Sequence, residues 1–200
     1  MMKINCFMIL VMFTAPLPLS AQVPVGTNNS NYWPVHRDIQ SGFRISYPTS
    51  WIVAQPKGVN VKFSVNPPDG PGNCNVVAKQ KPEINNINQP TLNQEIESLP
   101  QTQVDWAGYI GLQKSQVNLV QSRVAKIVDV PALMGVVETS IDNMEGKYLR
   151  KQLVALTFKP GILWTLNCGV SSFNFDEARE RFDKLEPVFN KIFGSFTFLP

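Results

Sequence analysis

Residues 147–170 read KYLRKQLVALTFKPGILWTLNCGV, and this stretch decides the expected fold. Lys159-Pro160-Gly161 separates two runs that have the composition of β-strands. In the first run, residues 153–158 are apolar at every position except Thr157, which is typical of a strand covered on both faces. In the second run, alternate residues are apolar, as in a half-buried strand: Ile162, Trp164, Leu166, Cys168 and Val170. We therefore expect a hairpin at the middle of a sheet that has helices on its faces.

The register of this hairpin has two alternatives. Pro160 and Gly161 at the two central positions would suit a type II turn. Matching the apolar faces requires a three-residue loop instead, which pairs Phe158 with Ile162, Leu156 with Trp164, and Val154 with Leu166. Because a slip of one residue turns every side chain to the other face, we expect the register that matches the apolar faces.

Composition favours one folded domain. The chain has 200 residues, of which 44% are hydrophobic and 16% charged, so a sizeable core is expected and global disorder is not. The formal net charge of +3 is small and scattered, which argues against a nucleic-acid partner. No internal repeat is visible in the sequence.

The N-terminus has the layout of a secretory signal. Lys3 precedes the apolar run of residues 6–13, and Ala21 offers a small residue at the cleavage point. The run is too short to span a membrane, although an uncleaved anchor is the alternative. We expect residues 1–21 to be a signal peptide, residues 22–41 a linker, and residues 42–200 a single domain. The mature protein is then periplasmic or secreted and has no stable membrane span.

The linker contains aromatic residues that need an explanation. Tyr32, Trp33 and His36 lie in a stretch that is rich in Pro, Asn and Gly and has no sustained apolar period. We expect these rings to dock onto their own domain. The four tryptophans at positions 33, 51, 106 and 164 read as core or near-core residues, and Trp33 and Trp106 are the two candidates for an exposed aromatic contact with a partner. Residues 28–30 form a glycosylation acceptor that matters only in a eukaryotic source.

Two cysteines remain once the signal, with its Cys6, is removed. Cys74 and Cys168 each lie in an expected strand. An even number in an oxidising compartment favours a disulfide between them, and two buried free thiols are the alternative. The bridge would stabilise the fold by about 2–4 kcal/mol.

The first half of the domain reads as strands followed by a helix. Residues 42–47, 59–65 and 74–79 alternate or are apolar, and we expect them to form an antiparallel meander. Thr91 and Gln94 match a capping box, so a helix is expected to begin at Thr91. Residues 101–114 are ambiguous because glycines interrupt their apolar positions.

The second half continues with strands and ends in a helix. Residues 115–128 and 133–141 read as strands before the hairpin. Residues 176–193 have apolar side chains at helical spacing, with Pro187 expected to break or kink the helix and Gly194 to cap it. Residues 195–199 read as a last short strand.

Several of these segments together resemble the PsbP-like superfamily, which includes extrinsic photosystem proteins, a nuclear Ran-release factor and bacterial envelope proteins. The resemblance covers residues 42–200 and rests on the order of Phe43-Arg44-Ile45-Ser46-Tyr47-Pro48 with Trp51, Val130-Pro131-Ala132, Gly161, Trp164-Thr165-Leu166, Phe182, Phe189, Ile192 and Ser195-Phe196. It implies an α+β fold in which an antiparallel β-sheet is flanked by helices, an α/β/α sandwich. It assigns no metal or partner residue here, because a shared fold does not carry a shared activity.

The polar residues of the sequence show no catalytic or metal-binding pattern. His36 is the only histidine, and no nucleophile motif accompanies it. Cys74, Cys168 and His36 lack the spacing of a metal site. The acidic residues near one strand read as solvated charges at its ends: Asp129, Glu138, Asp142 and Glu145.

We therefore expect an exported, non-catalytic binding or accessory protein. It would be a monomer that has no cofactor and acts through contacts with a protein partner whose identity the sequence does not give. A small-ligand carrier, which would need a deep apolar pocket beside the sheet, is the first alternative. A secreted hydrolase that uses His36 is the second.

Overall fold

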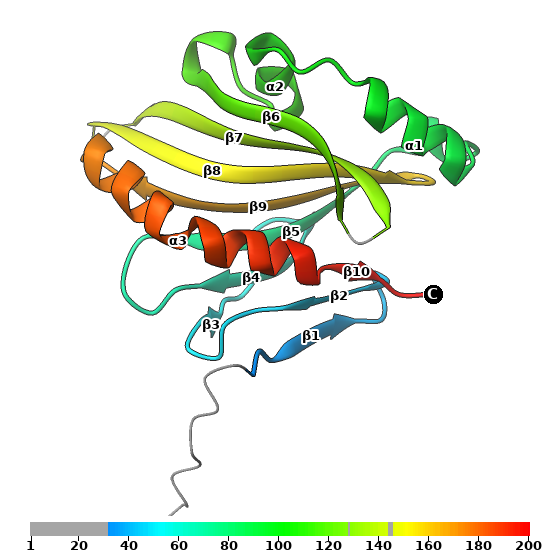
Figure 1. The fold of residues 1–200 in the computed structure, drawn as a ribbon, viewed down its shortest axis with the longest axis horizontal. Helices are drawn as coiled ribbons and strands as arrows, with labels where there is room; N and C mark the ends of the chain where they lie inside the picture. The colour runs from blue at the N-terminus through cyan, green and yellow to red at the C-terminus, as the bar shows by residue number, and fades with distance from the viewer. Residues whose placement is uncertain (1–31, 128, 144–145) are drawn as a thin grey trace, which may run out of the picture. The chain divides into compact units, whose positions relative to one another are not determined.

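The computed structural model describes residues 32–127, 129–143 and 146–200, which are shown in Figure 1. A seven-stranded antiparallel sheet has the order β3-β4-β5-β9-β8-β7-β6, and a smaller sheet has the order β1-β2-β10. The strands are β1 (Val35–Asp38), β2 (Phe43–Ser46), β3 (Ile52–Val53), β4 (Val61–Asn66), β5 (Asn73–Gln80), β6 (Val117–Ile127), β7 (Val130–Asn143), β8 (Gly146–Lys159), β9 (Ile162–Ser172) and β10 (Thr197–Phe198). The helices are α1 (Gln89–Ser98), α2 (Gln103–Ile110) and α3 (Phe175–Ser195), with 3₁₀ turns at Pro82–Ile84 and Lys114–Gln116.

Strand β8 is buried on both faces, as its sequence predicts. Leu153 and Ala155 belong to a core that includes the inner face of α3, which crosses one side of the sheet in Figure 1. Val154 and Leu156 belong to a second core on the opposite face, together with Trp106 of α2. Helix α1 packs against β7 and β8. The α+β fold, an antiparallel sheet between helical layers, is confirmed.

The expected hairpin register was wrong by one residue. Lys159 pairs with Ile162 across a two-residue turn, so that Leu153 lies opposite Cys168 and Leu156 lies opposite Thr165. Gly161 has a φ of 76°, the positive value that a type II turn requires at its second central position. Because β8 is apolar on both faces, its sequence favours neither register, and the turn decides.

The smaller sheet changes two expectations about the N-terminal part. Residues 35–38, which were expected in the linker, form β1 and pair with β2, so the domain begins before residue 42. The strand at residues 43–46 pairs with β1 and β10 and therefore does not join β4 and β5 in a meander. The sequence of β1, VHRD, is too short and polar to show its alternation of exposed and half-buried positions.

The ends of the helices also differ from those expected. Asn88 caps α1 by accepting a hydrogen bond from the Thr91 backbone N–H, so the helix begins before Thr91. Residues 101–114 contain α2, which begins at a capping box of Thr102 and Asp105. Helix α3 continues through Pro187 and beyond Gly194 to Ser195. Of the two alternatives for Pro187, a break is therefore excluded, and the expected cap at Gly194 was wrong because Phe196 is the C-cap residue.

Some expectations fall on residues that the structure does not describe. The signal peptide of residues 1–21 and the glycosylation acceptor at residues 28–30 lie outside the described residues. Within the described part of the chain, no helix is both long and apolar enough to cross a membrane.

Candidate binding groove

Cys74 and Cys168 lie directly opposite each other on neighbouring strands. Cys74 of β5 pairs with Cys168 of β9, and a disulfide joins the two side chains. Both residues are at most 3% exposed and belong to the core under α3. The pairing expected from the sequence is present, and its burial indicates a structural role.

Trp106 is not an exposed contact. Its side chain is 0% exposed, and its Nε1–H donates a hydrogen bond to Ser122 Oγ on β6 at 2.9 Å. Ser122 in turn donates to Gln101 Oε1 at 3.0 Å. The buried ring and its hydrogen bond therefore stabilise the packing of α2 on the sheet, because burying an indole ring is favourable when its N–H finds a partner.

Trp33 lies against its own domain, which the sequence favours over a partner contact. The ring is half-buried and packs on the core, and the Lys191 ammonium of α3 lies 4.2 Å from its centroid. This is the geometry of a cation–π contact. Trp33 therefore joins the chain that precedes β1 to α3.

His36 is a packing residue in β1. Its ring stacks on Phe63 with 4.4 Å between centroids and lies 5.9 Å from the ring of Phe43. Burial lowers the pKa of His36 below its ordinary value, and the charge of Asp38 opposes this to a smaller extent. No nucleophilic side chain among the described residues shares a hydrogen bond with its buried Nε2 atom.

Among the described residues, the buried carboxylate of Glu138 pairs with a cation and not with a second carboxylate. Glu138 accepts two hydrogen bonds from Arg179 of α3, at 2.9 and 3.0 Å, and a third from Asn118. The Arg179 hydrogen bond is the main reason why the pKa of Glu138 lies below its ordinary value. In the part of the chain that the structure describes, no group of three His, Cys, Asp or Glu side chains could hold a metal ion. Glu145 lies outside that part.

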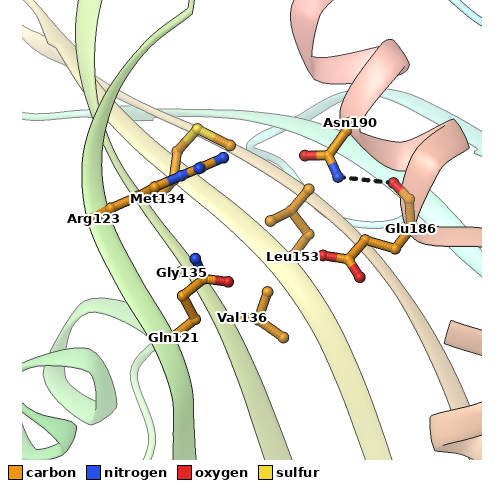
Figure 2. Close-up of a pocket in the computed structure, with 8 residues that line it drawn as sticks. All are labelled: Gln121, Arg123, Met134, Gly135, Val136, Leu153, Glu186 and Asn190. Carbon is orange, nitrogen blue, oxygen red and sulfur yellow. Dashed lines mark hydrogen bonds between the residues drawn. The ribbon is translucent and has the colours of Figure 1, made fainter. Parts of the chain in front are cut away.

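The feature that stands out is a groove between α3 and the edge of the large sheet. Helix α3 packs against β8, β9 and β2, which leaves part of β6 and β7 uncovered on this face. A pocket of about 150 Å³ occupies the space, and we name it the edge groove (Figure 2). Its lining residues come from four elements: Gln121, Arg123, Met134, Gly135, Val136, Leu153, Glu186 and Asn190.

The edge groove combines an apolar floor with charged walls. Met134, Val136 and Leu153 form the floor and belong to the core, whereas Arg123 lies on the β6 side and Glu186 on the α3 side, as Figure 2 shows. The Asn190 amide donates to the Glu186 backbone carbonyl at 3.0 Å, which fixes this side of the groove. The volume is below the roughly 300–1,000 Å³ of drug-sized ligand sites. The groove therefore suits one side chain of a partner better than a free ligand of that size.

Strand β6 forms one wall of the groove and is also the last strand of the sheet. A bulge at Val120 interrupts its pairing with β7, and pairing resumes from Gln121 to Ile127. Over residues 121–127 no hydrogen bond joins the outer backbone edge to another part of the described chain. The strand carries Arg123 and Lys126 and no acidic residue. Such an edge is a template for an additional strand.

The sequence could not have identified this groove. Its residues were not among the candidates, because each belongs to an ordinary strand or helix pattern. The site exists only because α3 crosses the sheet over β8 and β9 instead of β6 and β7. The basic character of β6, with two cations and no acid, is the one local signal.

Comparison with known structures supports the fold. The solution structure of cyanobacterial PsbP from Synechocystis sp. PCC 6803 has a TM-score of 0.53 at 17% identity, covering 90% of this chain and 99% of that one. The crystal structure of the Ran-binding protein Mog1p from Saccharomyces cerevisiae has a TM-score of 0.51 at 10% identity, covering 84% of this chain and 96% of that one. At these identities the likeness shows the fold alone.

Sequence comparison identifies the family. A search of curated protein sequences found no match. The PsbP family model matches residues 33–198, which is most of the chain and begins at Trp33, in the segment expected to be a linker. This chain therefore belongs to the PsbP family.

Proposed function

We propose that this chain is an exported, non-catalytic binding protein and that the edge groove is its site of contact with a partner protein. The observation that carries the proposal is the unpaired backbone edge of β6 beside an apolar floor. An extended segment of the partner pairs with residues 121–127 and places one apolar side chain on Met134, Val136 and Leu153. Main-chain hydrogen bonds then supply affinity, and the pocket supplies specificity.

The charges of the groove favour a particular partner segment. Arg123 and Lys126 lie on β6 without an acidic neighbour on that strand, so an acidic side chain of the partner would be attracted there. Glu186 on the opposite wall favours a cationic or hydrogen-donating group beyond the apolar side chain. The Saccharomyces cerevisiae protein of the same fold, Mog1p, is a Ran-binding protein, which supports protein binding as a role for this architecture.

Site-specific photo-crosslinking in the native cell tests this proposal. A photoreactive residue at Gln121 faces the edge groove, and one at Lys184 lies on the exposed side of α3 as the matched control. We expect Gln121 to form an adduct of one discrete mass, and Lys184 to form none of that mass. The charge reversal Arg123→Glu should abolish the Gln121 adduct.

Two outcomes would contradict the groove as the binding site. The same adduct from both positions would indicate contact without a defined surface. An adduct at Gln121 that survives Arg123→Glu unchanged would show that the charge of β6 plays no part. Turnover of a hydrolase substrate that is lost in His36→Ala would favour an enzyme instead.

Export is the second part of the proposal. Its support is the N-terminal signal pattern together with the Cys74–Cys168 disulfide, since disulfides persist in oxidising compartments. Cell fractionation should place the protein in the periplasm or the medium, and N-terminal sequencing should show a start near residue 22. A cytoplasmic protein that begins at Met1 would overturn this part. Light scattering of the mature protein should give the mass of a monomer.

A further inference from the structure

The large sheet carries a polar patch on the face opposite α3, over strands β5, β9 and β8. Helices α1 and α2 cover a different part of the same face, over β6, β7 and β8. At the uncovered end, the paired residues of neighbouring strands are small or carry amides and hydroxyls: Asn73, Asn75, Asn167, Gly169, Ser171, Gln152 and Arg150. Arg150 is the only charged residue among them.

The Arg150 side chain lies flat across this patch. From β8 its Nε donates to Gln152 Oε1 at 2.8 Å, its Nη2 reaches Asn73 Oδ1 of β5 at 2.7 Å, and its Nη1 lies 3.4 Å from Ser171 Oγ of β9. Reaching β5 from β8 requires the guanidinium to pass over β9, which separates them. Gly169, which pairs with Asn73, presents no side chain there.

The guanidinium has no carboxylate partner within the described residues, although it is half-buried. All three of its acceptors are neutral, and burial lowers the pKa of Arg150 from its ordinary value. An arginine remains charged in proteins, so this positive charge is partly removed from water with hydrogen bonds but without a neighbouring negative charge. An anion bound beside the guanidinium would supply the missing negative charge.

The three groups hydrogen-bonded to Arg150 keep donors that an incoming anion can use. The Asn73 and Gln152 oxygens are engaged by the guanidinium, which leaves their amide N–H groups. Ser171 accepts from Arg150 and so directs its own O–H elsewhere. Arg150 uses one N–H on each of its three nitrogens, which leaves one on each terminal nitrogen.

Arg150 and two of its partners line a hollow at the surface. A pocket of about 240 Å³ is bounded by Arg150, Asn73 and Ser171 together with Asn66, Pro71 and Gly72. We propose that this hollow is a binding site for a single carboxylate group, held by the guanidinium of Arg150 and flanked by Asn73 and Ser171. A single guanidinium matches a singly charged, planar carboxylate better than a phosphate, which carries more charge.

Nuclear magnetic resonance of the protein without its expected signal peptide, residues 22–200, tests the site. Sodium acetate is added at constant ionic strength against sodium chloride, and inorganic phosphate is titrated separately. Binding is followed through the chemical shifts of the Arg150 Nε–H and of the side-chain amides of Asn73 and Gln152. We expect saturable shifts with acetate, in the millimolar range of dissociation constants, and a loss of affinity of at least about tenfold in Arg150→Gln. Arg123→Gln, in the edge groove on the other face, is the control and should keep the response.

A second variant keeps the test decisive if Arg150→Gln folds poorly. Asn73→Asp would supply the carboxylate from within the chain, because Asn73 Oδ1 already lies 2.7 Å from Nη2. We expect this variant to melt at a higher temperature and to lose the acetate response. The proposal is overturned by shifts that do not saturate, by an acetate response that persists in Asn73→Asp, or by phosphate binding in place of acetate. A negative result at the carboxylate site would not count against the edge groove as a binding site, since the two sites lie on opposite faces of the sheet.

Discussion

A Cβ atom at Gly135 would overlap the indole ring of Trp106 at Cζ2. Gly135 lies in β7, and its backbone contributes to the edge groove on one face of the sheet while Trp106 covers it on the other. The absent side chain is therefore what allows α2 to approach the sheet closely enough to bury its tryptophan.

Gly135→Ala should consequently destabilise the protein. We expect a loss of about 1–3 kcal/mol, the usual cost of forcing extra volume into a packed core. Gly108→Ala is the matched control, because a Cβ at Gly108 in α2 meets nothing within 4 Å. Alanine in a helix interior should raise stability by about 0.5–1 kcal/mol. Urea unfolding of both variants measures the difference, and equal midpoints would refute the packing argument.

The Cys74–Cys168 bridge closes a long loop, with a sequence separation of 94 residues. Reduction should therefore lower the melting temperature, and Cys74→Ala should lower it by a similar amount, corresponding to about 2–4 kcal/mol. Adding reductant to Cys74→Ala should then have no further effect. Mass spectrometry of the non-reduced mature protein checks the premise, and two free thiols would contradict it.

Glu138 makes stability depend on pH in the acidic range. Its folded pKa is lowered from 4.5, chiefly by the Arg179 hydrogen bond. A lowered pKa means that the unfolded chain binds the proton more readily, so this contribution is complete above about pH 4.5 and is lost as pH falls through the folded pKa. Asn118 and Lys151 also favour the ionised form.

Glu138→Gln should therefore be less stable than the parent protein at pH 7, and the difference should shrink below pH 4.5. Thermal unfolding at several pH values measures this. Glu97→Gln, at an exposed position of α1, serves as the control and should show a small difference. A gap between Glu138→Gln and the parent that stays constant from pH 7 to pH 3 would show that the ion pair does not contribute as described.

The sequence predicts the layers of this fold because burial on both faces of β8 is a local signal. It could not settle the hairpin register, since Leu153 and Val154 are equally apolar and only the conformation at Gly161 distinguishes the alternatives. The boundary of the domain was misplaced because β1 is short and polar. A local sequence pattern therefore predicts that a strand is present better than it predicts how that strand pairs with its neighbours.

The two candidate sites depend on long-range relations that no local pattern contains. Arg150 meets Asn73 across 77 residues and Ser171 across 21. The edge groove depends on the path of α3 over the sheet. The local sequence does not show how Trp106 is buried, because Gly135, the residue that makes room for its ring, lies 29 positions later.

His36 should make the stability of the fold depend on pH in a second range, separate from that of Glu138. Burial lowers its pKa below the ordinary value of 6.5, so the unfolded chain again binds the proton more readily. The contribution of His36 is complete above about pH 6.5 and is lost as pH falls through the folded pKa. Asp38 is the charged group that opposes the shift.

His36→Phe should remove this dependence and keep the aromatic stack on Phe63, because both rings are planar and similar in size. It also removes the buried Nε2 atom, which has no hydrogen-bond partner among the described residues, so we expect the variant to be at least as stable as the parent at pH 7. Thermal unfolding from pH 7.5 to pH 5 measures the effect. The parent should lose stability over this range relative to His36→Phe, whereas parallel curves would mean that His36 is as accessible to protons in the folded state as in the unfolded chain.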